Sequence, residues 1–219
     1  MTIAENIARI RANMDAAARE AGRDPKEILL VGASKMNDAA ACREAVAAGI
    51  DALGENRVQE MVQKLEQHAY DGAPLHFIGH LQRNKVKQVV GHVALIQSVG
   101  SLELLDEIEK VAAARGLVQD ILLEVNIGRE AAKSGFAPEK VLPAAGAALE
   151  RTHVRVRGLM TIPPADAQRD ANFRYFQEVQ ALYVDMNQKL FHNELAYLSM
   201  GMSGDYEDAI RAGATMVRV

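Results

Sequence analysis

The first candidate for chemistry in this chain is a lysine at the end of an apolar segment. Lys35 follows residues 28–34, a short run rich in Leu, Ile and Val without polar alternation, which is typical of a strand buried on both faces. Burial would disfavour the charged form of such a lysine and make its amine available to attack a carbonyl. The segment therefore predicts a Schiff-base lysine. The alternative is a lysine at a strand end that extends its ammonium into solvent.

A segment near the C-terminus has the composition of a phosphate-binding loop. Residues 199–204 read Ser-Met-Gly-Met-Ser-Gly and precede a helix expected to begin near Asp205. Gly201 permits close approach of the backbone, Ser199 and Ser203 offer hydroxyl groups, and a helix N-terminus offers amides to an anion. The alternative is a tight turn in which Ser203 only caps the helix.

Arg218, on the last strand expected from the sequence, is a second cation in an apolar setting. It could bind the same anion, or it could hydrogen-bond the ring nitrogen of a cofactor. A lysine that traps a carbonyl, a phosphate loop and an arginine together resemble the groups that bind pyridoxal 5'-phosphate (PLP).

Two other patterns predict no chemistry. His76 and His80 have the i, i+4 spacing of a helical zinc site, but Phe77 and its neighbours indicate a strand and a turn, so we expect no metal. No serine lies in a Gly-x-Ser-x-Gly segment, which leaves a hydrolase unsupported.

The elements that would position these residues alternate regularly along the chain. Expected strands are 28–34, 51–54, 75–79, 93–97, 120–127, 155–161, 195–200 and 215–219. Expected helices are 3–21, 38–48, 56–69, 83–90, 101–115, 138–150, 168–190 and 205–212. Thr2 is expected to cap the first helix, with Glu5 completing a capping box.

Strict alternation of strand and helix predicts parallel strands with right-handed crossovers. We expect a single (β/α)8 TIM barrel over residues 1–219, with the extra N-terminal helix 3–21 covering the seam between the last strand and the first. A doubly wound sheet is the alternative, and the lack of a Gly-x-Gly-x-x-Gly segment after the first strand argues against it. Polar and glycine residues follow the strands, where barrel enzymes place their chemistry. Met160 is expected to line the pocket there.

Composition limits the classes of protein. The chain has 219 residues, 49% of them hydrophobic and 25% charged, with a formal net charge of -4, so nucleic acid is not an expected partner. No apolar stretch reaches the roughly 18 residues of a membrane span, and the N-terminus has no basic-then-apolar signal pattern. The only cysteine, Cys42, fits a reducing compartment. We expect a cytoplasmic protein.

An ordered set of motifs resembles the YggS/PROSC family of PLP homeostasis proteins along nearly the whole chain. The motifs are Leu-Val-Gly-Ala-Ser-Lys (30–35), Gly-Glu-Asn-Arg-Val-Gln-Glu (54–60), His-Phe-Ile-Gly-His-Leu-Gln-Arg-Asn-Lys (76–85), Val-Asn-Ile (125–127), Lys-Ser-Gly (133–135), Gly-Leu-Met-Thr-Ile (158–162) and Leu-Ser-Met-Gly-Met-Ser-Gly-Asp (198–205).

The resemblance implies a barrel similar to the N-terminal domain of alanine racemase and a site for PLP. It implies that Lys35 holds PLP as a Schiff base and that Asn56 lies close to the cofactor. It also implies that Ser199 and Ser203, with neighbouring amides such as that of Gly201, hold the phosphate. Arg218 would face the pyridine nitrogen. Lys133 would lie near the site without bonding the ring.

The chain departs from the family at its end. Family members continue past the matching Val-Arg pair with a Gly-Thr segment that helps to bind the phosphate, whereas this sequence stops at Val219. We therefore expect that the C-terminal end is truncated and that part of the phosphate site is missing from it.

The same residues favour a carrier over an enzyme. An arginine opposite the pyridine nitrogen cannot accept a proton from it, so the ring stays a weaker electron sink. A racemase also needs a second base, and no tyrosine is placed to supply it. We expect a monomer that binds PLP and releases or delivers it, with PLP-dependent apoenzymes as possible recipients. The alternatives are a racemase of the alanine racemase type and a cofactor-free Schiff-base aldolase acting on a sugar phosphate.

Overall fold

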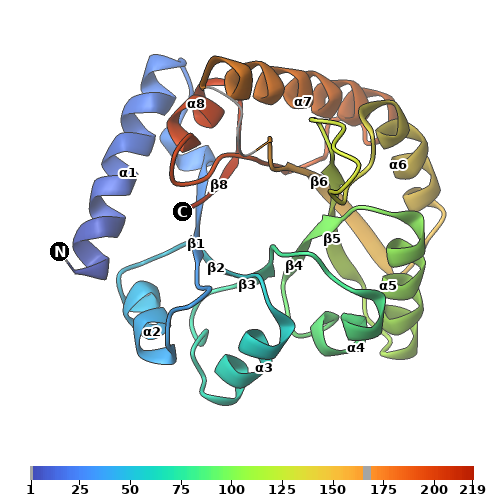
Figure 1. Ribbon diagram of the computed structural model, residues 1–219, viewed down its shortest axis with the longest axis horizontal. Coiled ribbons are helices and arrows are strands. Elements are labelled where there is room, and N and C mark those ends of the chain that lie inside the picture. Colours follow the sequence, from blue (N-terminus) through green and yellow to red (C-terminus); the bar gives the residue numbers. More distant parts are fainter. Residues whose placement is uncertain (1, 165–168) are drawn as a thin grey trace.

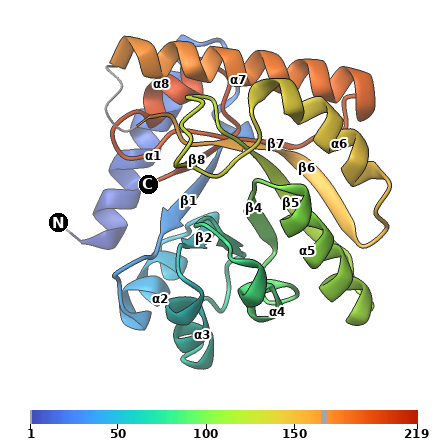
Figure 2. The ribbon, with the colours of Figure 1, turned by 45° about the vertical axis from the view of Figure 1, so that its right-hand side comes forward.

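The computed structural model describes residues 2–164 and 169–219. These residues form eight parallel strands, and the strands close into a barrel in the order of the chain, with β1 paired to both β2 and β8 (Figure 1). Helices surround the barrel on its outside (Figures 1 and 2). The prediction of a TIM barrel with an additional N-terminal helix is confirmed.

The bounds of the elements follow the expected alternation. The strands are β1 Leu29–Ala33, β2 Ala52–Glu55, β3 Leu75–Phe77, β4 Leu95–Val99, β5 Gln119–Val125, β6 Val154–Thr161, β7 Tyr197–Ser199 and β8 Met216–Arg218. The helices are α1 Ile3–Glu20, α2 Ala39–Ala47, α3 Val58–Glu66, α4 Val86–Val89, α5 Leu102–Ala114, α6 Val141–Leu149, α7 Arg169–Leu190 and α8 Tyr206–Arg211. Short 3-10 turns are η1 Pro25–Glu27, η2 Arg83–Lys85 and η3 Pro138–Lys140.

The expected bounds differ from the observed ones mainly at element ends. Strand 75–79 stops at Phe77 and strand 28–34 stops at Ala33, because the chain turns away from the sheet there. The helices expected over 83–90 and 138–150 each begin with a 3-10 turn, and in the second case a proline opens that turn. Position 168, the first of the expected helix 168–190, lies outside the described residues.

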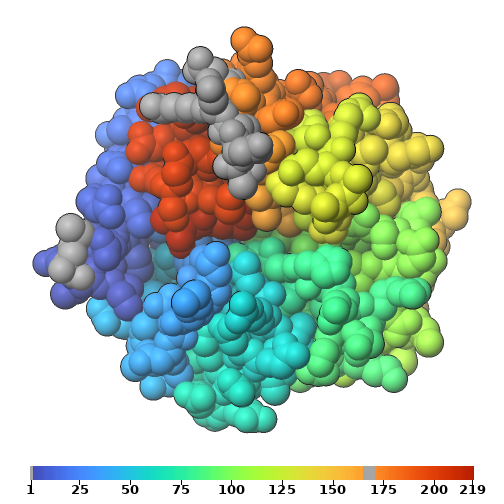
Figure 3. Space-filling view, viewed as in Figure 1, coloured from blue at the N-terminus to red at the C-terminus, as the bar shows by residue number. Residues whose placement is uncertain are grey.

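Helix α1 covers the seam of the barrel. Thr2 and Glu5 form the capping box expected from the sequence. The helix packs against α2 and α8, so the two ends of the chain lie side by side (blue and red in Figures 1 and 3). Arg23 adds a further link, since its Nη1 donates to the carbonyl oxygens of Ile210 and Ala214 at 2.9 and 2.7 Å.

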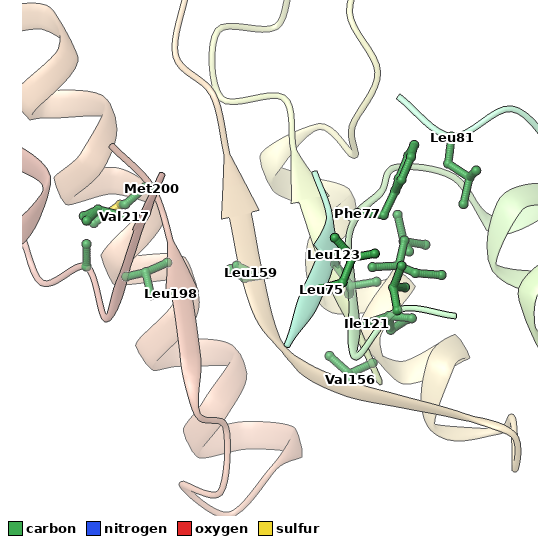
Figure 4. Close-up of a cluster of buried hydrophobic side chains, with 14 of the residues drawn as sticks. Leu75, Phe77, Leu81, Ile121, Leu123, Val156, Leu159, Leu198, Met200 and Val217 are labelled. Carbon is green, nitrogen blue, oxygen red and sulfur yellow. The ribbon is translucent and has the colours of Figure 1, made fainter. Parts of the chain in front are cut away.

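Buried apolar side chains form two layers. The larger layer lies between the sheet and the helices, and Figure 4 shows part of it, including Phe77, Leu123 and Val217. The smaller layer fills the barrel interior and consists of Val31, Ala52, Leu95, Leu122, Met160 and Met216. Interior and exterior positions alternate along each strand, and this alternation decides which side chains can reach the barrel mouth.

A bulge in β6 resets this alternation. Ile121 pairs with Val156, but Leu122 pairs with Gly158, so Arg157 is an extra residue. Gly158 has φ of 151°, and a Cβ at this position would overlap the Tyr197 carbonyl oxygen. Val156 faces the helices before the bulge, whereas Met160 faces the interior after it.

Candidate cofactor-binding site

The strand ends that carry the predicted site residues meet at one end of the barrel. Val31 pairs with Arg218 across the seam, and Ala33 pairs with Gly54, two residues before Asn56. Met160 pairs with Ser199. The barrel therefore brings β1, β2, β6, β7 and β8 together at their carboxyl ends, where such folds carry their chemistry.

Lys35 lies in a turn beyond the end of β1 and its side chain is exposed. It comes two residues after Ala33 and four after Val31, which faces the barrel interior. The prediction of a buried lysine is wrong, because the strand ends at Ala33 and the chain turns before Lys35 can be enclosed. Its exposed position matches the alternative of a lysine that reaches solvent from a strand end.

A buried ion pair lies behind this turn, on the outer side of β2. Lys64 Nζ approaches Glu55 Oε2 at 2.6 Å, and both residues are buried. Glu55 Oε2 also accepts hydrogen bonds from Ser34 Oγ at 2.9 Å and from the Tyr70 hydroxyl at 3.3 Å. Burial, and next the charge of Glu55, raise the pKa of Tyr70. The cluster joins α3 to the carboxyl ends of β1 and β2.

Arg218 is held inside the barrel by a chain of hydrogen bonds. Its Nη1 donates to Ser199 Oγ at 2.6 Å and its Nη2 donates to the Thr161 carbonyl oxygen at 2.9 Å. Ser199 Oγ in turn donates to Gln97 Oε1 at 2.6 Å, and Gln97 Nε2 lies 3.0 Å from Nδ1 of His76. Two strands, β6 through Thr161 and β7 through Ser199, thus hold the Arg218 guanidinium in place.

Burial changes the pKa of both residues at the ends of this hydrogen-bond chain, Arg218 and His76. It lowers the pKa of Arg218 to about 10, so the guanidinium is still charged at neutral pH. It lowers the pKa of His76 to about 4, so the imidazole is neutral and can accept from the Gln97 amide. The same effect raises the pKa of Glu124, which accepts from Ser134 Oγ at 3.0 Å.

Asn56 offers an acceptor without a protein partner. Among the described residues, its buried Oδ1 has no hydrogen-bond partner, although buried side-chain oxygens are normally satisfied. The backbone of Asn56 packs directly on Gly79, where a Cβ would overlap the Asn56 carbonyl oxygen. An amide oxygen held this way beside the Lys35 turn fits a donor group supplied by a ligand.

The 199–204 segment is divided between the interior and the surface. Ser199 is fully buried, whereas Ser203 is exposed. Gly201 has φ of 91°, and a Cβ there would lie 2.5 Å from Cβ of Ala209, so glycine lets this loop pack on α8. The N-cap of α8 is Asp205 and not Ser203, so the alternative in which Ser203 caps the helix is wrong.

Two further predicted residues lie at the edge of this arrangement. Met160 is fully buried in the interior layer, next to Ser199 in the sheet. Lys133 is exposed, pairs with Glu130 at 2.5 Å, and donates to the Pro163 carbonyl oxygen at 3.4 Å. Lys133 therefore links the loops after β5 and β6.

The described ranges contain no cluster of three His, Cys, Asp or Glu residues that could hold a metal. No described helix is long and apolar enough to cross a membrane.

Sequence reasoning missed Gln97, Glu55 and Lys64 as parts of the site. Gln97 had a signal, because a polar residue occupies an interior position of a buried strand. Lys64 also had one, since Val58, Met61 and Lys64 share the buried face of α3. A lysine on an otherwise apolar helix face indicates a buried partner.

Comparison with known proteins identifies the family of PLP homeostasis proteins that the sequence motifs resemble. Residues 6–219 match the family described as "Alanine racemase, N-terminal domain". The pyridoxal phosphate homeostasis protein of Aquifex aeolicus is 41% identical over 219 residues, which covers 100% of this chain and 96% of that protein. The protein of the same name from Pseudomonas aeruginosa is 41% identical over 218 residues, covering 100% of this chain and 93% of that protein.

A solved structure agrees with these relatives. PipY of Synechococcus elongatus, with PLP bound, superposes with a TM-score of 0.86 at 30% identity and covers 100% of this chain and 97% of that chain. The chain belongs to the YggS/PROSC family of PLP homeostasis proteins, which is built on the alanine racemase N-terminal barrel. The resemblance found in the sequence motifs is confirmed.

Proposed function

We propose that this chain is a PLP homeostasis protein that holds PLP as a Schiff base on Lys35 and releases or delivers it. The observation that carries the proposal is the meeting, at one end of the barrel, of the Lys35 turn, the unpartnered Asn56 oxygen and the buried Arg218. The names of the relatives and the PLP bound by PipY support it.

Each residue has a role in this proposal. When bound, PLP supplies an aldehyde, and condensation with a lysine amine replaces its C=O by C=N and releases one water. Lys35 provides the amine, Asn56 Oδ1 accepts from the cofactor, and Met160 forms the apolar floor. Amides around Gly201 and the exposed hydroxyl of Ser203 hold the phosphate, while Ser199, whose hydroxyl donates to Gln97 Oε1, holds Arg218 in place. Lys133 lies beside the site and adds positive charge.

Arg218 makes the site better suited to carrying PLP than to turning over amino acids. Its guanidinium stays protonated at neutral pH, since burial lowers its pKa only to about 10. A donor of this kind facing the ring nitrogen leaves that nitrogen without a proton, and the ring then stabilises a carbanion poorly.

The attachment site can be tested directly. The protein is incubated with PLP, reduced with borohydride, weighed by intact mass spectrometry and mapped by peptides. We expect one added PLP on Lys35 and visible absorbance that is lost in Lys35→Ala. Lys87→Ala, at an exposed lysine on α4, is the matched control and should label like the wild type. Labelling that persists in Lys35→Ala would contradict the proposal.

Delivery needs a separate experiment. The loaded protein is mixed with a PLP-dependent apoenzyme, either in one chamber or across a dialysis membrane. Faster reactivation in the shared chamber indicates direct delivery, and equal rates indicate release into solution.

Light scattering is expected to give the mass of a monomer, 23.8 kDa. A cytoplasmic location agrees with the buried free thiol of Cys42.

A further inference from the structure

Two side chains of helix α3 hold the peptide groups on either side of Lys35. Lys64 Nζ donates to the carbonyl oxygen of Ser34, the preceding residue, at 2.7 Å. Glu60 Oε2 accepts from the backbone N–H of Met36, the following residue, at 3.2 Å. Glu60 and Lys64 are four residues apart, which places them on the same face of a helix, with Nζ and Oε2 3.8 Å apart.

Both tethers are themselves anchored. Lys64 is 7% exposed and is paired with Glu55, which is fully buried. Glu60 is also bonded by Arg57 Nη1 at 3.3 Å. Long charged side chains lose conformational entropy when they form a hydrogen bond. Because Lys64 and Glu60 are already held by other partners, they lose less entropy when they bond the turn.

The part of the turn that follows Lys35 is exposed and strained. Met36 has φ of 62°, in the left-handed region that a side chain other than glycine disfavours. Its side chain is 89% exposed, so packing does not compensate for that backbone conformation. Asn37 Nδ2 donates to the Lys35 carbonyl oxygen at 3.2 Å, a bond within the turn itself. On the Ser34 side, β2 also holds the turn, since the Ser34 N–H donates to the Gly54 carbonyl oxygen at 2.8 Å and Ser34 Oγ donates to Glu55 Oε2 at 2.9 Å. On the Met36 side, the bond from Glu60 connects the turn to α3.

We infer that Glu60 and Lys64 are positioning residues for Lys35. They hold the strained turn in the conformation that presents the lysine amine at the barrel mouth, and they keep this conformation populated before any cofactor arrives. The inference rests on the proposed function of Lys35. A protein whose competent conformation is only partly populated binds its ligand more weakly by that fraction.

A purely structural role would give a different pattern. The Lys64–Glu55 pair alone would fix α3 against β2 and would need no contact with Met36. The bond from Glu60 separates the two roles, because its acceptor serves the Met36 amide in the turn, and its other contacts are with Arg57 and Lys64 of the same region and not with β2.

The test compares Glu60→Ala with Glu60→Gln and Glu66→Ala. Glu60→Gln keeps an oxygen that can accept from the Met36 amide. Glu66→Ala removes the same charge from an exposed position of the same helix. Hydrogen exchange at the Met36 amide is measured without PLP, the rate of borohydride-trapped labelling at Lys35 is measured with PLP, and Tm is recorded for each variant.

For Glu60→Ala we expect faster exchange at Met36 and labelling slowed about fivefold, which corresponds to the roughly 1 kcal/mol that one hydrogen bond typically contributes. Glu60→Gln and Glu66→Ala should remain close to the wild type in both measurements. Labelling of Glu60→Ala at the wild-type rate would overturn the inference.

The failure of the proposed function is distinguishable from the failure of this inference. If the wild type does not label at Lys35, the function is wrong, and exchange at Met36 still decides whether the tether exists. Lys64→Met removes the second tether but leaves Glu55 buried without its partner, which strongly destabilises a protein. If Lys64→Met does not fold, the comparison of Glu60→Ala with Glu60→Gln alone decides whether α3 positions Lys35.

Discussion

Arg218 connects the barrel interior to the proposed site. Its guanidinium bonds a neutral hydroxyl on β7 and a backbone carbonyl at the end of β6. Neither hydrogen-bond partner is charged, and although burial lowers the pKa of the guanidinium, the carboxylates of Asp205 and Glu124 act on it from further away by raising that pKa. The bonds continue through Gln97 to His76, so a neutral histidine on β3 takes part in orienting an arginine on β8.

The buried histidine predicts a dependence of stability on pH. Burial lowers the pKa of His76 from 6.5 to about 4. Between these values the unfolded chain binds a proton that the folded chain does not, so stability is present above pH 6.5 and is lost as the pH falls toward 4. The full effect is on the order of 3 kcal/mol. His76→Gln should make the free energy of unfolding, measured with urea, fall less steeply over this window.

His92→Gln is the control for this experiment, because His92 is exposed. It should keep the wild-type slope, since it leaves the buried imidazole of His76 and its contact with Gln97 in place. Equal slopes in His76→Gln and the wild type would show that the interior histidine titrates as it does in the unfolded chain.

For single residues, the sequence identified which residues belong to the site better than it predicted how buried each of them is. Lys35, Asn56, Ser199 and Arg218 were identified from strand ends and motifs, and the strands bring their positions to one end of the barrel. The sequence left a buried and an exposed Lys35 as alternatives, because the choice depends on where β1 stops and on bonds from helix α3.

Among the elements, the tight contact between the ends of β2 and β3 shapes the site. A Cβ at Gly79 would overlap the Asn56 carbonyl oxygen. We expect Gly79→Ala to lower the free energy of unfolding by about 2–4 kcal/mol, because backbone must move to relieve the overlap. PLP labelling at Lys35 should also slow, since Asn56 would shift. Urea denaturation and borohydride trapping measure the two effects.

Gly146→Ala is the matched control for this prediction. Gly146 lies inside α6, and a Cβ there has no described atom within 4 Å. The change should stabilise the protein by about 0.5–1 kcal/mol, because alanine favours a helix interior over glycine. If Gly79→Ala behaved like Gly146→Ala, the close packing of β3 on Asn56 would not be needed.

Hydrophobic periodicity predicted the order and type of the elements. It did not predict which side chains of a strand point to the barrel interior and which point to the helices. In β6, simple alternation would place Val156 and Met160 on the same face. The bulge at Arg157 separates them. A bulge depends on the neighbouring strand, here on the Tyr197 carbonyl oxygen beside Gly158, and a single strand's sequence does not contain that information.

On the scale of the whole molecule, the proposed ligand should stabilise the closed barrel. PLP would bind residues from β1, β2 and β8 together, so it binds the folded state and not the unfolded one. At about 100 times the Kd it should raise the free energy of unfolding by about 2.7 kcal/mol. Thermal denaturation over a series of PLP concentrations measures this effect.

Pyridoxine 5'-phosphate, which lacks the aldehyde, is the matched ligand for that series. It should stabilise the wild type less than PLP does, and Lys35→Ala should reduce the advantage of PLP over it. Equal stabilisation by the two ligands in the wild type would show that the aldehyde contributes nothing to binding.

The seam between the first and last strands has a consequence for biosynthesis. Val31 pairs with Arg218, so this contact can form only after both strands have left the ribosome. A nascent chain that ends before Arg218 would carry the Lys35 turn without the strand pairing that closes the barrel.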